Sequence, residues 1–302
     1  MDTPLVSVII PTYRRPDTLD IAINSVLEQT YINVEVIVVD DNNPESEGRK
    51  LTENKMLPFA NNPRVIYLKH EKNKNGSAAR NTGARFSKAK YIAFLDDDDI
   101  FLPTKIQNQV EQLEKLPSDY GASYTSFYTK KPGSKPILEN ENRSGDVFFE
   151  SLSRQLYGCF GSNLLVKKSA FDEIGGFDES FIRNQDVEFC TRLFYKYKLS
   201  FVSTPGLIVN VHFAHSYYDP VEISKQYMQK FKPYVDELPI NKQKEFYSIY
   251  FKYIFFVHLR IHKNLKKCIQ MIYKREISLF EAITVLFDTV VKTIKVLFQK
   301  LH

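Results

Sequence analysis

Apolar runs and polar segments alternate regularly along the first hundred residues of the chain. Four runs are rich in β-branched and aromatic residues and predict buried strands: Leu5–Ile10, Val34–Val39, Arg64–Lys69 and Tyr91–Leu95. Helical segments separate them, notably from Pro16 to about Thr30 and from Ser77 to Ser87. Strands that alternate with helices at this spacing pair in parallel. We therefore expect an α/β fold with a Rossmann-like, doubly wound and mostly parallel sheet, covered by helices on both faces.

The pattern between residues 101 and 220 is less regular. Four further strands are predicted: Gly121–Phe127, Gly161–Val166, Ser200–Val202 and Leu207–Phe213. The charged stretch Lys130–Arg143 contains two prolines and is typical of a loop. We expect this loop to lie over the functional site of the protein. A short helix is predicted over Lys168–Ile174, and another begins near Arg183. We interpret residues 1–220 as one domain made of two halves, about 1–100 and about 101–220.

A helical period takes over after Val221. Apolar residues near the C-terminus recur at steps of three and four: Leu279, Phe280, Ile283, Leu286, Phe287, Val290, Val291, Ile294, Leu297 and Phe298. Glu281, Asp288 and Lys292 fall off this face, so we expect an amphipathic helix. Three interpretations of the helical region 221–302 remain open: packing back on the first domain, contact with a membrane surface, and a homo-oligomer interface.

Charge is distributed unevenly along the chain. The 302 residues carry 41 Lys or Arg and 36 Asp or Glu, a net charge of +5, and residues 225–302 alone carry 15 basic and 6 acidic residues. Such asymmetry predicts an anionic surface as the partner of the tail. No nucleic-acid-binding motif accompanies the basic residues, so the pattern favours anionic lipid over nucleic acid.

The cysteines and the N-terminus bear on the cellular compartment. Cys159, Cys190 and Cys268 form no CxxC pair, and their odd number argues against a disulfide framework. The chain enters a strand near Leu5 with no basic, apolar leader before it. We expect a cytoplasmic protein, either free or held at the inner face of the membrane.

Four consecutive carboxylates, Asp96–Asp99, directly follow the fourth predicted strand. An ionised carboxylate is not buried without a partner, and ligands of open α/β sheets bind beyond the carboxyl ends of the strands. A hard divalent cation that bridges protein and phosphate would meet both conditions, whereas a solvated acidic turn is the plainer alternative. Polar residues also follow the first two strands, at Thr12–Arg15 and Asp40–Asp41, so we expect one cleft. No GxGxxG motif follows the first strand, which disfavours a dinucleotide cofactor.

Five short strings in this order resemble the family 2 glycosyltransferases: Val6–Tyr13, Val39–Asp41, Ala79–Gly83, Phe94–Asp99 and Gly175–Glu179. Each is weak alone, but together they span roughly residues 4–215. The resemblance implies a GT-A fold and a nucleotide-sugar donor, which we take to be a UDP-sugar. It also implies Mn²⁺ or Mg²⁺ bound through an Asp-x-Asp motif, and inversion at the anomeric carbon. Residues 1–100 would then form the nucleotide-sugar half and residues 101–220 the acceptor half.

The resemblance also implies roles for single residues. The nucleoside pocket would be formed by Pro11, Thr12, Tyr13, Arg15 and Asp40. Arg80 would contact the base or a phosphate, with an ordinary ion pair on a helix surface as the alternative. Asp98 would bind the metal directly. Asp96, also part of the metal motif, would hold the ribose or a metal-bound water, and Asp97 would help to bind the nucleotide. His212 stands where the family often has a histidine that completes the metal shell; a core or surface histidine is the alternative.

Asp186 matches the proposed catalytic base of the family, although Gln185 stands where a glutamate is usual. Inversion requires a carboxylate on the sugar face opposite the leaving group, close enough to accept the proton of the attacking hydroxyl. A helix N-cap is the other interpretation of Asp186.

The predicted function is metal-dependent transfer of a hexose or N-acetylhexosamine to a hydroxyl of a glycan, glycolipid or glycoprotein acceptor, with no nucleic-acid partner. A sugar-nucleotide nucleotidyltransferase is a second hypothesis, disfavoured because Pro11–Arg15 contains no glycine. A non-catalytic carbohydrate-binding protein is a third, disfavoured because both Asp98 and Asp186 are present.

Overall fold

The computed structural model describes residues 3–139, 141–158, 161–211 and 218–299, with side chains in the last helix described as far as Thr289. The chain divides into two compact units, Met1–Ala214 and His215–His302. We predicted this boundary a few residues later, at 220. Each unit has its own hydrophobic core.

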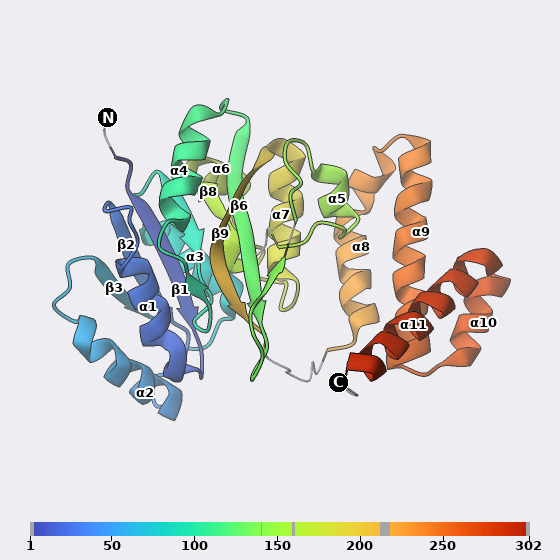
Figure 1. Ribbon diagram of the computed structural model, residues 1–302, viewed down its shortest axis with the longest axis horizontal. Helices are drawn as coiled ribbons and strands as arrows, with labels where there is room; N and C mark the ends of the chain where they lie inside the picture. Colours follow the sequence, from blue (N-terminus) through green and yellow to red (C-terminus); the bar gives the residue numbers. More distant parts are fainter. Residues whose placement is uncertain (1–2, 140, 159–160, 212–217, 300–302) are drawn as a thin grey trace. The chain divides into compact units, whose positions relative to one another are not determined.

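The first half of the sheet is parallel throughout. Its strands are β1 (Val6–Thr12), β2 (Val34–Asp40), β3 (Val65–Lys69) and β4 (Tyr91–Phe94), in the order β3-β2-β1-β4 (Figure 1). Successive side chains of a strand point to opposite faces. Val8 and Ile10 therefore pack in one core cluster and Ile9 in the other, so β1 is buried on both faces of the sheet.

The second half of the sheet is mixed. Its strands are β5 (Ile100–Phe101), β6 (Tyr120–Lys130), β7 (Ile137–Glu139), β8 (Leu165–Lys167) and β9 (Lys198–Asn210). The order continues as β4-β8-β6-β9-β5, with β7 paired to β6. Among the described strands of this half, β6 and β9 pair in parallel and the other pairs are antiparallel, including those of β8 with both its neighbours. The mostly parallel arrangement expected from the sequence thus describes the first half of the sheet.

Three local predictions in this half differ from the structure. Ser200–Val202 and Leu207–Phe213 were expected as separate strands, but β9 runs through Pro205-Gly206 with only a register shift against β6. Within the predicted strand Gly161–Val166, Gly161–Asn163 forms a 3₁₀ turn, η3, because Gly161 has a φ of +51° that breaks an extended strand. Part of the loop predicted over Lys130–Arg143 is β7, which folds back on β6 as a hairpin.

The helices of the first unit connect these strands. They are α1 (Leu19–Leu27), α2 (Glu47–Met56), α3 (Gly76–Phe86), α4 (Lys105–Lys115), α5 (Phe148–Leu152), α6 (Lys168–Glu173) and α7 (Gln185–Lys196), with 3₁₀ turns η1 (Pro16–Thr18) and η2 (Leu57–Phe59). Helix α2 was not predicted. It buries only Arg49, Thr52 and Met56, so its sequence lacks the apolar period that reveals a helix.

The second unit is helical, as predicted. It contains α8 (Pro220–Asp236), α9 (Ile240–Phe256), a π-helical turn η4 (Val257–Ile261), α10 (Leu265–Tyr273) and α11 (Leu279–Gln299). Helix α11 begins with a reciprocal cap, in which the Glu281 carboxylate accepts from Ser278 N at 3.0 Å and Ser278 Oγ accepts from Glu281 N at 3.2 Å. No helix within the described ranges has the combination of length and hydropathy needed to cross a bilayer.

Candidate active site

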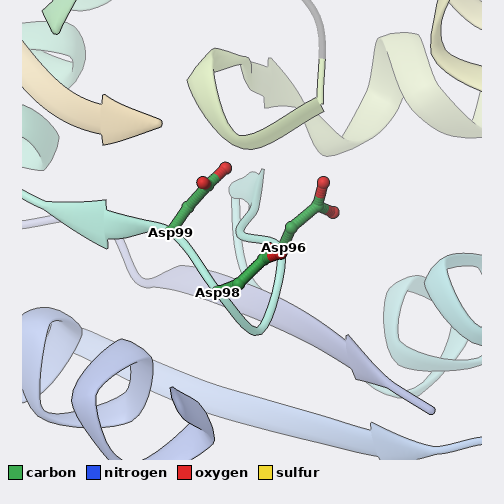
Figure 2. Close-up of side chains that lie close together, drawn as sticks. All are labelled: Asp96, Asp98 and Asp99. Carbon is green, nitrogen blue, oxygen red and sulfur yellow. The ribbon is translucent and has the colours of Figure 1, made fainter. Parts of the chain in front are cut away.

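The acidic turn after β4 brings three carboxylates together. Figure 2 shows the side chains of Asp96, Asp98 and Asp99 close together. Each offers one carboxylate oxygen, and these three oxygens lie within 4.8 Å of one another. Asp96 is partly exposed, whereas Asp98 and Asp99 are buried. Three carboxylates at this spacing offer the hard oxygen ligands that Mg²⁺ and Mn²⁺ prefer, so the residues fit the divalent cation implied by the sequence.

Asp99 is the member of this cluster that the sequence analysis missed. Its carboxylate accepts hydrogen bonds from Ser162 Oγ at 2.5 Å and Asn210 N at 2.9 Å. Burial, followed by the charge of Asp96, raises the pKa of Asp99 to about 8, which these hydrogen bonds only partly oppose. The fourth aspartate in the run was the available signal, but an Asp-x-Asp motif gave no reason to choose it.

A buried lysine holds the turn that faces this cluster. Lys105 Nζ donates to Asn163 O at 2.9 Å, Asn163 Oδ1 at 3.0 Å and Gln109 Oε1 at 2.9 Å. The neighbouring Ser162 accepts from Asp96 N at 2.9 Å through its hydroxyl and donates to Asp99. Burial lowers the pKa of Lys105 well below its usual value. The sequence offers no signal for this role, because Lys105 is one of many lysines.

The end of β1 supplies two groups that meet the acidic turn. Thr12 Oγ1 donates to Asp97 Oδ2 at 2.8 Å. The Arg15 guanidinium forms an ion pair with Asp98 and lies 3.5 Å from Asp97 Oδ1. Burial raises the pKa of Asp97 to about 6, against the lowering effect of Arg15. The structure thus brings the predicted residues Thr12, Arg15, Asp97 and Asp98 together.

Two other residues predicted for the nucleoside pocket lie on the same strand end. Pro11 is partly buried, and Tyr13 is 36% exposed. Arg14 lies over the Tyr13 ring, with its guanidinium carbon 4.9 Å from the ring centroid. The ring of Tyr13 therefore has an accessible part that could stack on a planar base.

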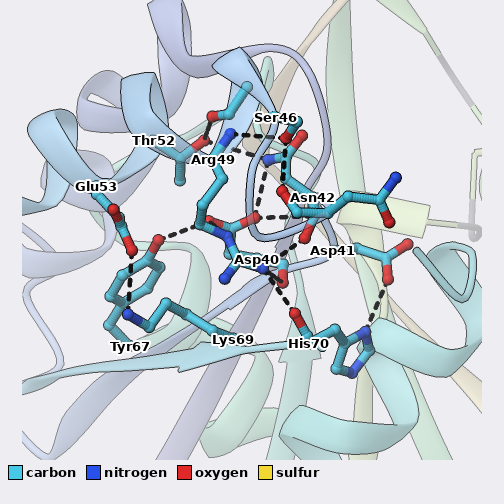
Figure 3. A network of polar contacts seen from close by, with 12 residues as sticks. Asp40, Asp41, Asn42, Ser46, Arg49, Thr52, Glu53, Tyr67, Lys69 and His70 are labelled. Carbon is cyan, nitrogen blue, oxygen red and sulfur yellow. Dashed lines mark hydrogen bonds and ion pairs between the residues drawn. The ribbon is translucent and has the colours of Figure 1, made fainter. Parts of the chain in front are cut away.

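Asp40 lies in a different setting from the one expected. Its side chain has no exposure and is surrounded by protein partners (Figure 3). Arg49 Nε lies 2.9 Å from Oδ2, Tyr67 Oη donates to Oδ2 at 2.5 Å, and Asn42 N donates to Oδ1 at 2.9 Å. These contacts use both carboxylate oxygens, so the structure does not present Asp40 to a nucleoside as it presents Tyr13.

The neighbouring Asp41 organises the loop that leads into α3. Its carboxylate accepts from Lys74 N at 2.8 Å and Asn75 N at 2.9 Å, and it lies 2.7 Å from His70 Nδ1. Asn75, with a φ of +93°, caps α3 by accepting from Ala78 N at 3.1 Å. This loop sets where α3 begins, and so fixes the position of Arg80.

Arg80 connects the acidic turn to the helix that carries Asp186. Its Nη2 donates to Asp96 Oδ1 at 2.5 Å, and its Nη1 donates to Gln185 Oε1 at 3.3 Å. The guanidinium also lies over the Phe177 ring, 5.6 Å from its centroid. Arg80 is therefore more than the surface ion pair considered as its alternative.

Asp186 lies in the first turn of α7, at the edge of a cavity of about 140 Å³. The cavity is lined by Arg80, Asp96, Gly161, Ile182, Arg183, Asn184, Gln185 and Asp186. A Cβ atom on Gly161 would lie 3.9 Å from Oδ2 of both Asp96 and Asp186. The two carboxylates therefore face the same small space, which a side chain at position 161 would reduce.

The environment of Asp186 changes its acidity in two opposing ways. Burial raises the pKa of Asp186, while the charge of Arg80 and a hydrogen bond from Val187 N lower it. Asp186 is partly buried and lines the cavity. Cleft-lining carboxyl groups with altered pKa values are typical of general acids and bases. His212, predicted as a metal ligand, lies outside the described residues.

Comparisons with known proteins identify the family and the fold of this chain. A family model described as Glycosyl transferase family 2 matches residues 7–175. The uncharacterized glycosyltransferase RP339 of Rickettsia prowazekii is 32% identical over 202 residues, which are 64% of this chain and 59% of that protein. WfgD of Escherichia coli, a UDP-Glc:alpha-D-GlcNAc-diphosphoundecaprenol beta-1,3-glucosyltransferase, is 38% identical over 115 residues, or 38% of this chain and 43% of that protein. The chain thus spans about half the length of these two relatives.

A solved structure has a similar fold. The crystal structure of S. aureus TarS 1–349 in complex with UDP-GlcNAc superposes with a TM-score of 0.63 at 15% sequence identity, covering 94% of this chain and 80% of that chain. This likeness confirms the fold class predicted from the sequence. Since the family model covers more than half of its residues, this chain belongs to glycosyl transferase family 2.

Proposed function

We propose that this chain is an inverting, metal-dependent glycosyltransferase that moves a hexose or N-acetylhexosamine from a UDP-sugar to an acceptor hydroxyl. The observation that carries the proposal is the shared cavity, which Asp186 and Asp96 face from different elements while Asp98 and Asp99 lie beside Asp96. A base and a carboxylate cluster around one space are what direct displacement at a sugar carbon needs.

The proposed reaction assigns one proton transfer to Asp186. The acceptor hydroxyl approaches the anomeric carbon from the side opposite the diphosphate, and Asp186 accepts its proton as the new C–O bond forms. The bond between the anomeric carbon and the diphosphate oxygen breaks in the same step, so UDP leaves and the configuration inverts. The raised pKa of Asp186 suits this role, because a more basic carboxylate accepts the proton more readily.

Two arginines would handle the negative charge of the donor. Arg15 is more than half exposed, and its ion pairs with described residues are those with Asp97 and Asp98, so it is placed to meet a phosphate that approaches the acidic turn. Arg80 would keep Asp96 in place from the other side. Asp96, Asp98 and Asp99 would hold Mg²⁺ or Mn²⁺, which when bound supplies positive charge to offset the departing diphosphate.

The proposed substrates rest on the relatives. TarS has been crystallised with UDP-GlcNAc, and two E. coli relatives, WfgD and WfaP, are named for UDP-Glc as donor and GlcNAc-diphosphoundecaprenol as acceptor. By analogy, we infer a UDP-sugar donor and an acceptor glycan carried on a lipid diphosphate. A cytoplasmic location at the membrane face would suit such an acceptor.

A panel of nucleotide sugars tests the proposal. The full chain is incubated with UDP-Glc, UDP-GlcNAc, UDP-Gal and GDP-mannose in the presence of Mn²⁺ or Mg²⁺, with and without a GlcNAc-diphosphate-lipid acceptor. We expect UDP release from one UDP-sugar, a larger release when an acceptor is present, and a product of inverted anomeric configuration by NMR. A product of retained configuration, or diphosphate release from UTP and a sugar phosphate instead, would contradict it.

A further inference from the structure

Helix α11 turns its large apolar residues away from the core of its own unit. Leu279, Phe280, Ile283 and Phe287 are each more than half exposed. The face that packs inward carries Ala282, Val285 and Thr289 instead. Over the described side chains, the apolar stripe predicted from the sequence is therefore the uncovered face of the helix, and its last five residues, Val290 to Phe298, lie beyond those side chains.

Helix α10 shows the same arrangement. Cys268 and Met271 are buried in the core of the unit, while Leu265, Ile269 and Tyr273 are more than 60% exposed. These three residues are spaced four apart, so they form one stripe along the helix. Isolated exposed apolar residues are ordinary, but seven large ones on two successive helices are not.

Basic residues surround the α10 stripe. Lys266 and Lys267 lie in its first turn, Lys263 precedes the helix, and Lys274 and Arg275 follow it. Within the described part of the chain, none of these five forms an ion pair with an acidic residue. Lys263 and Arg275 also have φ values of +51° and +57°, positions that favour glycine or asparagine.

We propose that α10 and α11 form a docking surface for an anionic lipid bilayer. The exposed apolar side chains would enter the boundary between headgroups and acyl chains, and the basic residues beside the α10 stripe would contact the headgroups. A second copy of this chain fits less well, because a self-complementary contact would bring the basic residues of both copies together. Anionic headgroups supply the opposite charge. The proposal does not depend on the sugar, the acceptor or the roles of Asp96 and Asp186.

Vesicle flotation of the full chain tests this surface. Vesicles of phosphatidylcholine alone are compared with vesicles of phosphatidylcholine and phosphatidylglycerol, at salt from about 0.01 M to about 1 M, over which the Debye length falls from about 30 Å to about 3 Å. We expect binding to the anionic vesicles at low salt that weakens as salt rises, and at least tenfold weaker binding to the neutral ones.

Matched variants identify the surface. Phe280→Glu on the apolar arc of α11 is compared with Asn241→Glu, which adds the same charge to an exposed position in the first turn of α9. We expect at least tenfold weaker binding for the first and little change for the second. Lys266→Ala with Lys267→Ala should weaken binding by about thirtyfold at low salt, whereas Lys242→Ala with Lys244→Ala in α9 should not.

Circular dichroism and light scattering complete the test, because they report folding and mass. A folded protein that does not bind anionic vesicles at low salt, or that loses binding equally with Phe280→Glu and Asn241→Glu, would overturn the proposal. So would a salt-resistant oligomer that Phe280→Glu dissociates, since that outcome would assign the surface to a second copy.

Discussion

Arg80 Nη2 lies 2.5 Å from Asp96 Oδ1, and the same guanidinium is the largest influence that lowers the pKa of Asp186. One side chain of α3 therefore contacts the acidic turn and also lowers the pKa of the proposed base on α7, against the larger raising effect of burial. Arg80 also contacts α7 directly, because its Nη1 donates to Oε1 of Gln185 at 3.3 Å and Gln185 directly precedes Asp186. A glutamate at position 185 would place a further negative charge beside the base.

Replacement of Arg80 should therefore change the pH dependence of turnover. Asp186 acts as a base only when it is ionised, so the rate falls as the pH drops through its pKa. Arg80 favours the ionised form, and Arg80→Met removes that effect. We expect the acid limb of the kcat profile to move to higher pH, as measured with saturating UDP-sugar.

Arg80→Lys is the control, because it keeps the charge while losing the two-sided contact with Asp96 and Gln185. Its acid limb should stay closer to that of the wild type. If both variants showed an unchanged limb but lower UDP affinity, Arg80 would be a donor contact alone, as in the original sequence interpretation.

Asp186→Asn should lower turnover by about a hundredfold or more, the usual scale for loss of a general base. UDP affinity, measured by calorimetry, should change little, because the proposed role of Asp186 concerns the acceptor. Asp178→Asn, at a partly buried position before α7, provides the comparison for a lost charge nearby. A variant that lost UDP binding and kept its rate with saturating donor would show that Asp186 contacts the donor nucleotide and is not the base for the acceptor.

The sequence predicted the strand ends well because they depend on local patterns. A buried strand such as Tyr91–Phe94 must stop where ionised residues begin, and parallel strands end at one edge of the sheet, so Thr12, Arg15 and Asp98 were expected to be neighbours. The contact between Arg80 and Asp96 follows from the chain path, because α3 is the helix that directly precedes β4 and Asp96 lies just after β4.

The environment of Asp40 could not be read from the sequence. Its partners Arg49 and Tyr67 come from α2 and β3, and nothing in the local pattern distinguishes a carboxylate used by such partners from one that faces a ligand. The orientation of α11 escaped prediction for a related reason. Periodicity shows that a helix has an apolar face, but close packing selected the small residues Ala282 and Thr289 for the interior.

Asp40→Asn separates the two roles considered for this residue, a contact with the nucleoside and a structural ion pair with Arg49. Arg49 is 5% exposed, so loss of the Asp40 charge would leave a buried guanidinium without its ion-pair partner. We expect the free energy of unfolding in urea to fall by about 3 kcal/mol. The double variant Asp40→Asn with Arg49→Met should recover part of this loss, because it removes both charges. A stable Asp40→Asn protein with weak UDP binding would instead restore the predicted nucleoside contact.

Asp98 and Asp99 of the acidic turn are predicted to bind a metal ion, and Asp119, which lies outside that turn, serves as the control. Asp98→Ala and Asp99→Ala each remove one of three oxygen ligands, and we expect each to weaken Mn²⁺ binding by about tenfold or more. Asp119→Ala removes an exposed carboxylate that pairs with Lys198 and should leave Mn²⁺ binding unchanged.

The readout is Mn²⁺ titration followed by electron paramagnetic resonance of the free ion, with and without UDP, so that binding is measured apart from turnover. Asp99 is the sharper test, because Ser162 and Asn210 already donate to it and a purely structural carboxylate would need no cation. If Asp99 has only a structural role, Asp99→Asn keeps one of the two acceptor oxygens and should bind Mn²⁺ normally. If Asp99 is a metal ligand, Asp99→Asn and Asp99→Ala should both bind Mn²⁺ poorly. Undiminished Mn²⁺ binding by both Asp98→Ala and Asp99→Ala would rule out a metal site at this turn.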